Sequence, residues 1–270
     1  MKSYFFPLWI VVIGALSLLP FLWFVLTSVK SAAQITAIPP QIMPAFHADF
    51  YRSAVSEYGL FRYLANSVIV AGSTTLISIA IGALAAYALT RFRFSWARSY
   101  LMLLLAISMF PQISIAGPVW RILSHLDWLN TYQGITAAYI SLSLPLAVWI
   151  LTTFFRELPY EIEEAALIDG CSRLQALRKV VLPLAAPGLF TAAILVFIHA
   201  WNEFFFALII LTNSNLQTLP VGIALFPGEY TMPWGEIAAA STMATLPLIV
   251  LTLLFQRRII RGLSAGAVKG

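Results

Sequence analysis

The sequence predicts an all-α integral membrane protein with six transmembrane helices. Three observations lead to this fold class. Of the 270 residues, 60% are hydrophobic and 10% are charged, whereas a soluble domain carries about 25% charged residues. Six apolar stretches reach the roughly 20 helical residues that are needed to cross a hydrocarbon core about 30 Å thick. These stretches are apolar nearly all round and lack the alternation of a transmembrane strand.

The first apolar stretch runs from Tyr4 to Val29. It exceeds the roughly 7–15 residues of a signal-peptide core, so we expect a retained helix. Prolines inside the stretches should kink their helices, which would suit a moving conduit, although proline is also common in membrane helices. These prolines are Pro20, Pro111, Pro118, Pro145 and Pro247. The expected spans are Leu8–Val29, Leu64–Leu89, Tyr100–Ile122, Gly134–Phe155, Gly188–Leu211 and Ile237–Gln256.

The composition also excludes several classes of protein. A mean hydropathy of +0.87 leaves too little polar surface for a soluble enzyme or a nucleic-acid-binding domain, and it is too high for intrinsic disorder. Cys171 is the single cysteine of the chain. An intrachain disulfide, a CxxC redox pair and a cysteine-rich zinc site are therefore excluded, and we expect no metal site.

The basic residues indicate how the spans are oriented. Twelve of the 16 Lys and Arg residues lie on the side that carries both predicted termini. Because basic residues gather in cytoplasmic loops, both termini are expected in the cytoplasm. The net charge of +5 is thus explained by topology and by contact with lipid headgroups, and we expect no nucleic-acid partner.

The inner loop between the fourth and fifth spans, residues 156–187, predicts a helical hairpin. Acidic residues near Glu161 favour the start of a first helix, and Gly170 stands where a left-handed residue would end it. Ser172 and Gln175 have the spacing of a capping box, which starts a second helix, and Pro183 should close that helix. Such a loop could also be an amphipathic hairpin lying on lipid headgroups.

This loop resembles the EAA motif of the permease subunits of binding-protein-dependent ABC importers. The family pattern is Glu-Ala-Ala, three residues, Gly, nine residues, Ile, one residue and Leu-Pro. Val180 in place of Ile is the one departure, and it keeps a β-branched apolar side chain. The matching positions are Glu164-Ala165-Ala166, Gly170, Val180 and Leu182-Pro183.

Three further stretches look like the carbohydrate branch of that family, in particular the smaller permease subunit of the maltose and trehalose type. They are residues 127–134, Trp201-Asn202-Glu203 and the tail Gly262–Gly270. The resemblance implies a type I importer fold with three parts. Residues 1–63 would form the first helix and an outer loop, residues 64–256 the permease core, and residues 257–270 a cytoplasmic tail.

The resemblance also implies a mechanism and partners. A second permease subunit would complete the translocation path, two ATPase subunits would each grip an EAA hairpin, and an extracytoplasmic solute-binding protein would deliver the sugar. ATP and Mg²⁺ would bind the ATPase subunits, because this chain has no GxxxxGK[ST] P-loop and is expected to be non-catalytic and free of cofactors. The expected setting is a prokaryotic plasma or inner membrane, and the expected substrate is a disaccharide such as trehalose or maltose.

The family assigns roles to three groups of residues in this sequence. The coupling contact with the ATPase would be made by Glu164, Ala165, Ala166, Asp169, Gly170, Leu182 and Pro183. The tip of the outer loop that meets the binding protein would be Phe226, Pro227, Gly228, Glu229 and Tyr230. The tail residues Ser264, Gly266 and Lys269 would lie at the ATPase interface.

Polar residues within the spans are candidates for the translocation path. His199, Asn202 and Glu203 would share one face of the fifth span, where an ionisable group should face water or the bundle interior. Gln112 and Ser114, beside Pro111, are further candidates. The alternative is an interhelical hydrogen bond to the partner permease or to the second span, which carries Ser73, Thr74, Thr75 and Ser78.

A second class of function remains open at this point. A proton-coupled secondary transporter or a channel could use Glu203 or His199 as its titrating group. The EAA spacing and the lack of evident internal repeats argue against it.

Overall fold

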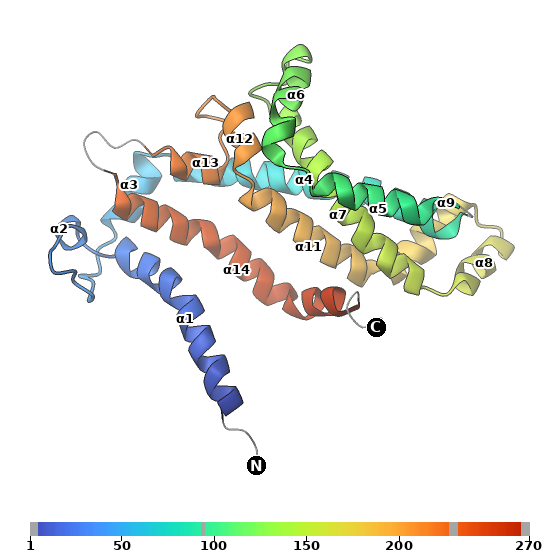
Figure 1. The fold of residues 1–270 in the computed structure, drawn as a ribbon, viewed down its shortest axis with the longest axis horizontal. Helices are drawn as coiled ribbons and strands as arrows, with labels where there is room; N and C mark the ends of the chain where they lie inside the picture. Colours follow the sequence, from blue (N-terminus) through green and yellow to red (C-terminus); the bar gives the residue numbers. More distant parts are fainter. Residues whose placement is uncertain (1–4, 93–94, 227–231, 266–270) are drawn as a thin grey trace. The chain divides into compact units, whose positions relative to one another are not determined.

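The computed structural model describes residues 5–92, 95–226 and 232–265, and every regular element within these ranges is helical (Figure 1). Four of the described helices are long and apolar enough to cross a membrane, and two bent helix pairs raise the total to as many as six spans. The predicted all-α class is confirmed. In chain order the elements are α1 (Phe5–Ser28), α2 (Ala32–Ile35), α3 (Asp49–Ser56), α4 (Leu60–Arg91), α5 (Ala97–Ser108), α6 (Gln112–His125), α7 (Tyr132–Glu157), α8 (Tyr160–Ile168), α9 (Arg173–Ala176), η1 (Leu177–Val181), α10 (Leu182–Leu184), α11 (Ala186–Asn202), α12 (Phe205–Ile210), α13 (Leu219–Ala224) and α14 (Trp234–Ala265).

Helices α1, α4, α7 and α14 correspond to the first, second, fourth and sixth predicted spans. The fourth span, α7, begins at Tyr132 because Thr131 is its N-cap. The Thr131 side chain accepts the N–H of Gly134 at 3.1 Å. The sixth is longer than predicted. Helix α14 continues past Gln256 to Ala265, so most of the segment expected as a tail is helical.

The third span departs from the prediction of one kinked helix. Helices α5 and α6 meet at a bend of 93°, and Pro111 between them has an extended backbone with φ −59° and ψ 124°. Proline has no N–H to donate and disfavours helical geometry in the residue before it. The helix therefore stops and restarts at Pro111, whereas Pro20, Pro118, Pro145 and Pro247 lie inside helices.

The chain forms two compact units. The first contains Met1–Leu64 and Leu219–Ile249. Within it, the hydroxyl of Ser28 at the end of α1 lies 2.8 Å from the hydroxyl of Tyr51 in α3. The side chains of α1 from position 9 to position 25 are exposed and almost all apolar. Such a surface is suited to lipid or to another protein chain.

The second unit contains Ala65–Thr218 and Val250–Gly270. Helix α7 packs against both α5 and α11 in this unit. The approach to α11 is close, because a Cβ at Gly188 would lie 2.3 Å from Cγ of Phe154. The apolar core beside this contact joins α4, α7 and the hairpin through Ala83, Tyr87, Leu151, Phe155, Leu177 and Val181.

Candidate functional site

The first limb of the predicted hairpin is α8, and it ends as its sequence indicates. Asp169 is the C-cap, and Gly170 follows it with φ +87°. The N–H of Gly170 donates to the carbonyl of Leu167 at 3.1 Å, and the N–H of Cys171 donates to that of Ala166 at 3.0 Å. This pair of bonds is a Schellman motif, in which a left-handed residue reverses the chain. The predicted left-handed glycine at the end of the first helix is confirmed.

The second limb begins with the predicted capping box. The Ser172 side chain accepts the N–H of Gln175 at 3.3 Å, and the Gln175 side chain accepts the N–H of Ser172 at 2.8 Å. The limb ends at Leu184, one residue past Pro183, close to the predicted end. It runs through the π-helical turn η1 into α10, where Pro183 lies in the first turn and its missing N–H is tolerated. It then bends by 79° into α11.

The outer surface of the hairpin carries most of the predicted coupling residues. Glu164, Ala165, Asp169, Gly170 and Pro183 are exposed, whereas Ala166 and Leu182 are partly buried. Two exposed apolar side chains flank the turn, Ile168 at 86% exposure and Leu174 at 59%. Sequence reasoning did not single out these two residues. Small, apolar and acidic groups thus surround the Gly170 turn, and its two exposed apolar side chains are suited to contact with another protein.

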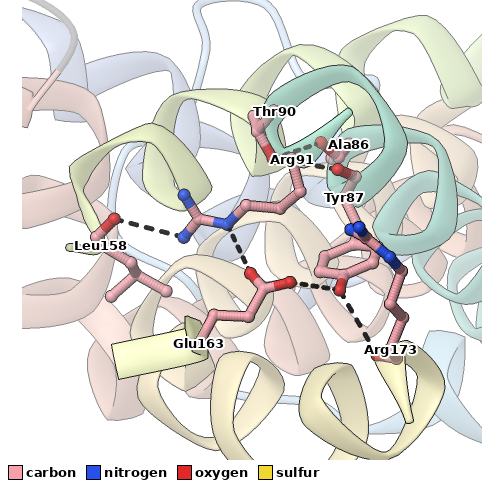
Figure 2. Close-up of polar contacts among 7 residues, drawn as sticks. All are labelled: Ala86, Tyr87, Thr90, Arg91, Leu158, Glu163 and Arg173. Carbon is pink, nitrogen blue, oxygen red and sulfur yellow. Dashed lines mark hydrogen bonds and ion pairs between the residues drawn. The ribbon is translucent and has the colours of Figure 1, made fainter. Parts of the chain in front are cut away.

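The inner surface of the hairpin holds a buried charge. Glu163 is 1% exposed, and its Oε2 lies 2.9 Å from Nε of Arg91 at the end of α4. The hydroxyl of Tyr87, one turn earlier in α4, donates to Oε1 of the same carboxylate. Figure 2 shows the Glu163 carboxylate held between these two side chains. A buried carboxylate is tolerated only when it is paired in this way.

The same cluster contacts the backbone on both sides of α8. Arg91 donates from Nη2 to the carbonyl of Leu158, which precedes α8, at 3.2 Å. The Tyr87 hydroxyl also lies 3.3 Å from the carbonyl of Arg173, the first residue of α9. Sequence reasoning missed Tyr87, Arg91 and Glu163. The available signal was the i, i+4 spacing of Tyr87 and Arg91, which places both on one face of α4.

The fifth span ends sooner than predicted, and this changes the place of Glu203. Helix α11 ends at Asn202, and Glu203 has an extended backbone with φ −68° and ψ 128°. Its carboxylate accepts the N–H groups of Phe206 at 2.9 Å and Ala207 at 3.2 Å, so it caps α12. The expectation that Glu203 shares a helical face with His199 and Asn202 is wrong. Glu203 is 7% exposed and is held by local backbone donors.

The other candidates for the path remain accessible. His199 and Asn202 are exposed near the end of α11, and Ser114 is exposed and Gln112 partly buried in the first turn of α6. Nδ1 of His199 lies 3.3 Å from the hydroxyl of Ser143 in α7. The interhelical contact of His199 is thus made to the fourth span and not to the second, which was the expected alternative.

Two groups of predicted contact residues are only partly described. Phe226 is 5% exposed, and its ring stacks on Tyr58 with centroids 4.5 Å apart. Its ring is therefore part of the core of the first unit and not at an exposed tip as expected. Ser264 lies in the last turn of α14. Pro227, Gly228, Glu229, Tyr230, Gly266 and Lys269 lie outside the described residues.

Comparisons with known proteins give a consistent result. Residues 78–265 match the family described as the inner membrane component of binding-protein-dependent transport systems. The chain is 41% identical over 263 residues to the trehalose/maltose transport system permease protein MalG of Thermococcus litoralis, covering 96% of this chain and 94% of that protein. It is 42% identical over 257 residues to the trehalose transport system permease protein SugB of Mycobacterium tuberculosis, covering 94% and 93%.

Two further comparisons extend this result. The sulfoquinovosyl glycerol transport system permease protein SmoH of Agrobacterium fabrum is 42% identical over 256 residues, covering 94% of this chain and 89% of that protein. Among solved structures, a chain of a bacterial ABC transporter involved in the import of the acidic polysaccharide alginate matches with a TM-score of 0.79. That match is 21% identical and covers 93% of this chain and 94% of the other. At this identity the likeness concerns the fold.

Proposed function

Because the chain belongs to the inner membrane components of binding-protein-dependent transport systems, we propose that its Gly170 hairpin couples a sugar path to separate ATPase subunits. The chain is a multi-pass membrane protein and a non-catalytic permease subunit of a carbohydrate ABC importer, with a type I fold. The proposal concerns its partners, its coupling surface and its substrate.

The observation that carries the coupling role is the exposed rim of the Gly170 turn. Glu164, Ala165 and Asp169 point outward together with the apolar side chains of Ile168 and Leu174. Exposed isoleucine and leucine beside a sharp turn are unfavourable in water, and a groove on a partner protein would remove them from it. Ala165 lets that partner approach closely.

We infer that the partners are a second permease subunit, two ATPase subunits and an extracytoplasmic solute-binding protein. The exposed apolar side chains of α1 support a neighbouring chain or lipid around this helix. ATP and Mg²⁺ would bind the ATPase subunits only. The expected location is the plasma or inner membrane of a prokaryote, with the hairpin and both termini in the cytoplasm.

The substrate that we propose is a disaccharide such as trehalose or maltose. Two relatives above 40% identity are named for trehalose or for trehalose and maltose, which supports this class. His199 and Asn202, with Gln112 and Ser114, supply hydroxyl-binding groups for the path. Glu203 is a weaker candidate for proton coupling, because its carboxylate already accepts two backbone N–H groups.

Reconstitution of the complete complex in proteoliposomes tests this function. The substitution Glu164→Lys should leave a membrane-inserted permease and abolish substrate-stimulated ATP hydrolysis, because it reverses a charge on the contact surface. The control is Glu161→Lys, which makes the same change at another exposed acid of α8. Stimulation at the wild-type level in Glu164→Lys would contradict the coupling role.

A further inference from the structure

The three acids of α8 have different environments. Glu161 and Glu164 are exposed, whereas Glu163 is 1% exposed. An exposed acid near a helix start interacts with the helix dipole and with water. A buried acid has neither solvent nor freedom to move, so its partners determine where the helix can sit.

The partners of Glu163 all lie outside α8. Arg91, whose side chain is 6% exposed, makes the ion pair, and Tyr87 donates the hydrogen bond. Both atoms of the ion pair are buried, and the surrounding side chains of the core are apolar, among them Phe155 and Leu177. The packed apolar side chains resist displacement through their shape, and the ion pair adds a Coulomb attraction between two specific atoms that must be overcome to separate α8 from α4.

The cluster gives the hairpin a third attachment. Through the chain, α8 is connected to α7 on one side and to α9 on the other. Through Glu163 it is also fixed to α4, whose residue Tyr87 lies 76 residues before Glu163 in the chain. The Tyr87 hydroxyl lies near the Arg173 carbonyl and Arg91 donates to the Leu158 carbonyl, so α4 contacts the backbone on both sides of α8 (Figure 2).

We propose that Glu163, Arg91 and Tyr87 are positioning residues that transmit movement of the hairpin to α4, the second span. This inference rests on the proposed coupling role of the hairpin. The Gly170 rim meets the partner, and the buried cluster on the opposite surface converts displacement of the rim into displacement of α4. Loss of the cluster leaves the rim intact, so the partner still binds but its movement no longer reaches the second span.

The first test is Glu163→Gln in the complete complex in proteoliposomes. We expect the ATPase to copurify in the wild-type ratio, while sugar uptake and substrate-stimulated hydrolysis fall about tenfold. The matched control is Glu161→Gln, which removes an exposed acid two residues away and should stay within about twofold of wild type. Wild-type uptake in Glu163→Gln would overturn the inference. Loss of copurification would also overturn it, because the role proposed here leaves the rim intact.

A charge exchange separates positioning from a general need for either residue. Arg91→Glu alone should abolish coupling, and the double variant Arg91→Glu with Glu163→Arg should recover part of it. Failure of the double variant to recover any uptake, while it assembles normally, would overturn the inference. If the single charge variants do not accumulate, Tyr87→Phe keeps the ion pair and removes only the hydroxyl. We expect about a threefold loss of uptake there, and no loss would count against the role of Tyr87.

The outcomes also separate this inference from the function on which it rests. If Glu164→Lys uncouples and Glu163→Gln does not, the hairpin couples to the ATPase and the buried cluster does not transmit. If neither variant uncouples, the coupling role itself fails.

Discussion

The carboxylate of Glu203 accepts the backbone N–H of Phe206 at 2.9 Å and so caps a helix that begins inside the fifth apolar stretch. An acid in such a stretch is expected to face a path or a polar partner. Here the backbone of the next turn supplies the partner. The break between α11 and α12 and the acid that caps it therefore belong to one local arrangement.

We expect Glu203→Ala to destabilise the complex and Glu203→Gln to do so less. Alanine leaves the two buried N–H groups unsatisfied, at a cost of about 1–2 kcal/mol. Glutamine keeps one acceptor oxygen. The thermal unfolding midpoint of the detergent-solubilised complex measures this difference. If Glu203→Gln instead abolished uptake with an unchanged midpoint, a direct role of the carboxylate in transport would replace the capping role.

The Gly170 turn should be sensitive to the shape of the side chain placed there. Gly170→Val forces a β-branched residue to φ +87°, which costs at least about 1–2 kcal/mol. We expect a membrane-inserted permease without substrate-stimulated ATP hydrolysis. Gly170→Asn is the control, because asparagine tolerates left-handed geometry and should keep most of the stimulation. Equal activity of the valine and asparagine variants would contradict a conformational requirement.

The exposed side chain of Ile168 should matter for binding the partner and not for folding of the permease. Ile168→Asp places a charge on a rim that we propose is buried by the ATPase, and desolvating it should weaken association by about tenfold or more. Association can be measured by copurification at increasing dilution. Ile168→Leu keeps the apolar surface and should bind as wild type does. An undiminished affinity of Ile168→Asp would place the interface elsewhere.

The source of energy separates the importer from a proton-coupled carrier. Uptake into proteoliposomes should require ATP on the hairpin side and should persist when a protonophore collapses the pH gradient. His199→Gln removes the titrating ring and keeps hydrogen-bonding capacity, so we expect ATP-driven uptake to continue with a change in the KM for sugar. Abolition of uptake by the protonophore would favour the proton-coupled alternative.

Local chemistry explains which parts of the fold could be predicted. Hydropathy places the first, second, fourth and sixth spans because a membrane helix needs a long apolar run. The Gly170 turn and the Ser172 capping box depend on neighbours a few residues away, so their sequence pattern suffices. The breaks at Pro111 and Glu203 occur inside apolar runs. Most residues on both sides of each break are apolar, so hydropathy does not indicate that the helix stops there.

Tertiary contacts explain what the sequence could not indicate. Glu161, Glu163 and Glu164 are the same residue type on one short helix, and only the approach of α4 makes Glu163 the buried one. Its partner Arg91 lies at the end of another helix, far away in the chain, so no local sequence pattern links the two residues. The burial of Phe226 against Tyr58 likewise depends on a contact between distant segments.

The second limb contains a π-helical turn at Leu177–Val181, and the direction in which the hairpin points depends on where residues are added to or removed from this limb. A π-helical turn takes up about one residue more than an α-helical turn, so deleting one residue there would leave an ordinary α-turn. Deleting a residue from the α-helical part of the limb would instead favour a rotation of the Gly170 rim by about 100° about the limb axis, which would oppose its attachment to α4. The number of residues in the α-helical part of the limb therefore sets the direction in which the rim faces. A deletion there would alter the contact with the partner even though every side chain of the rim is unchanged.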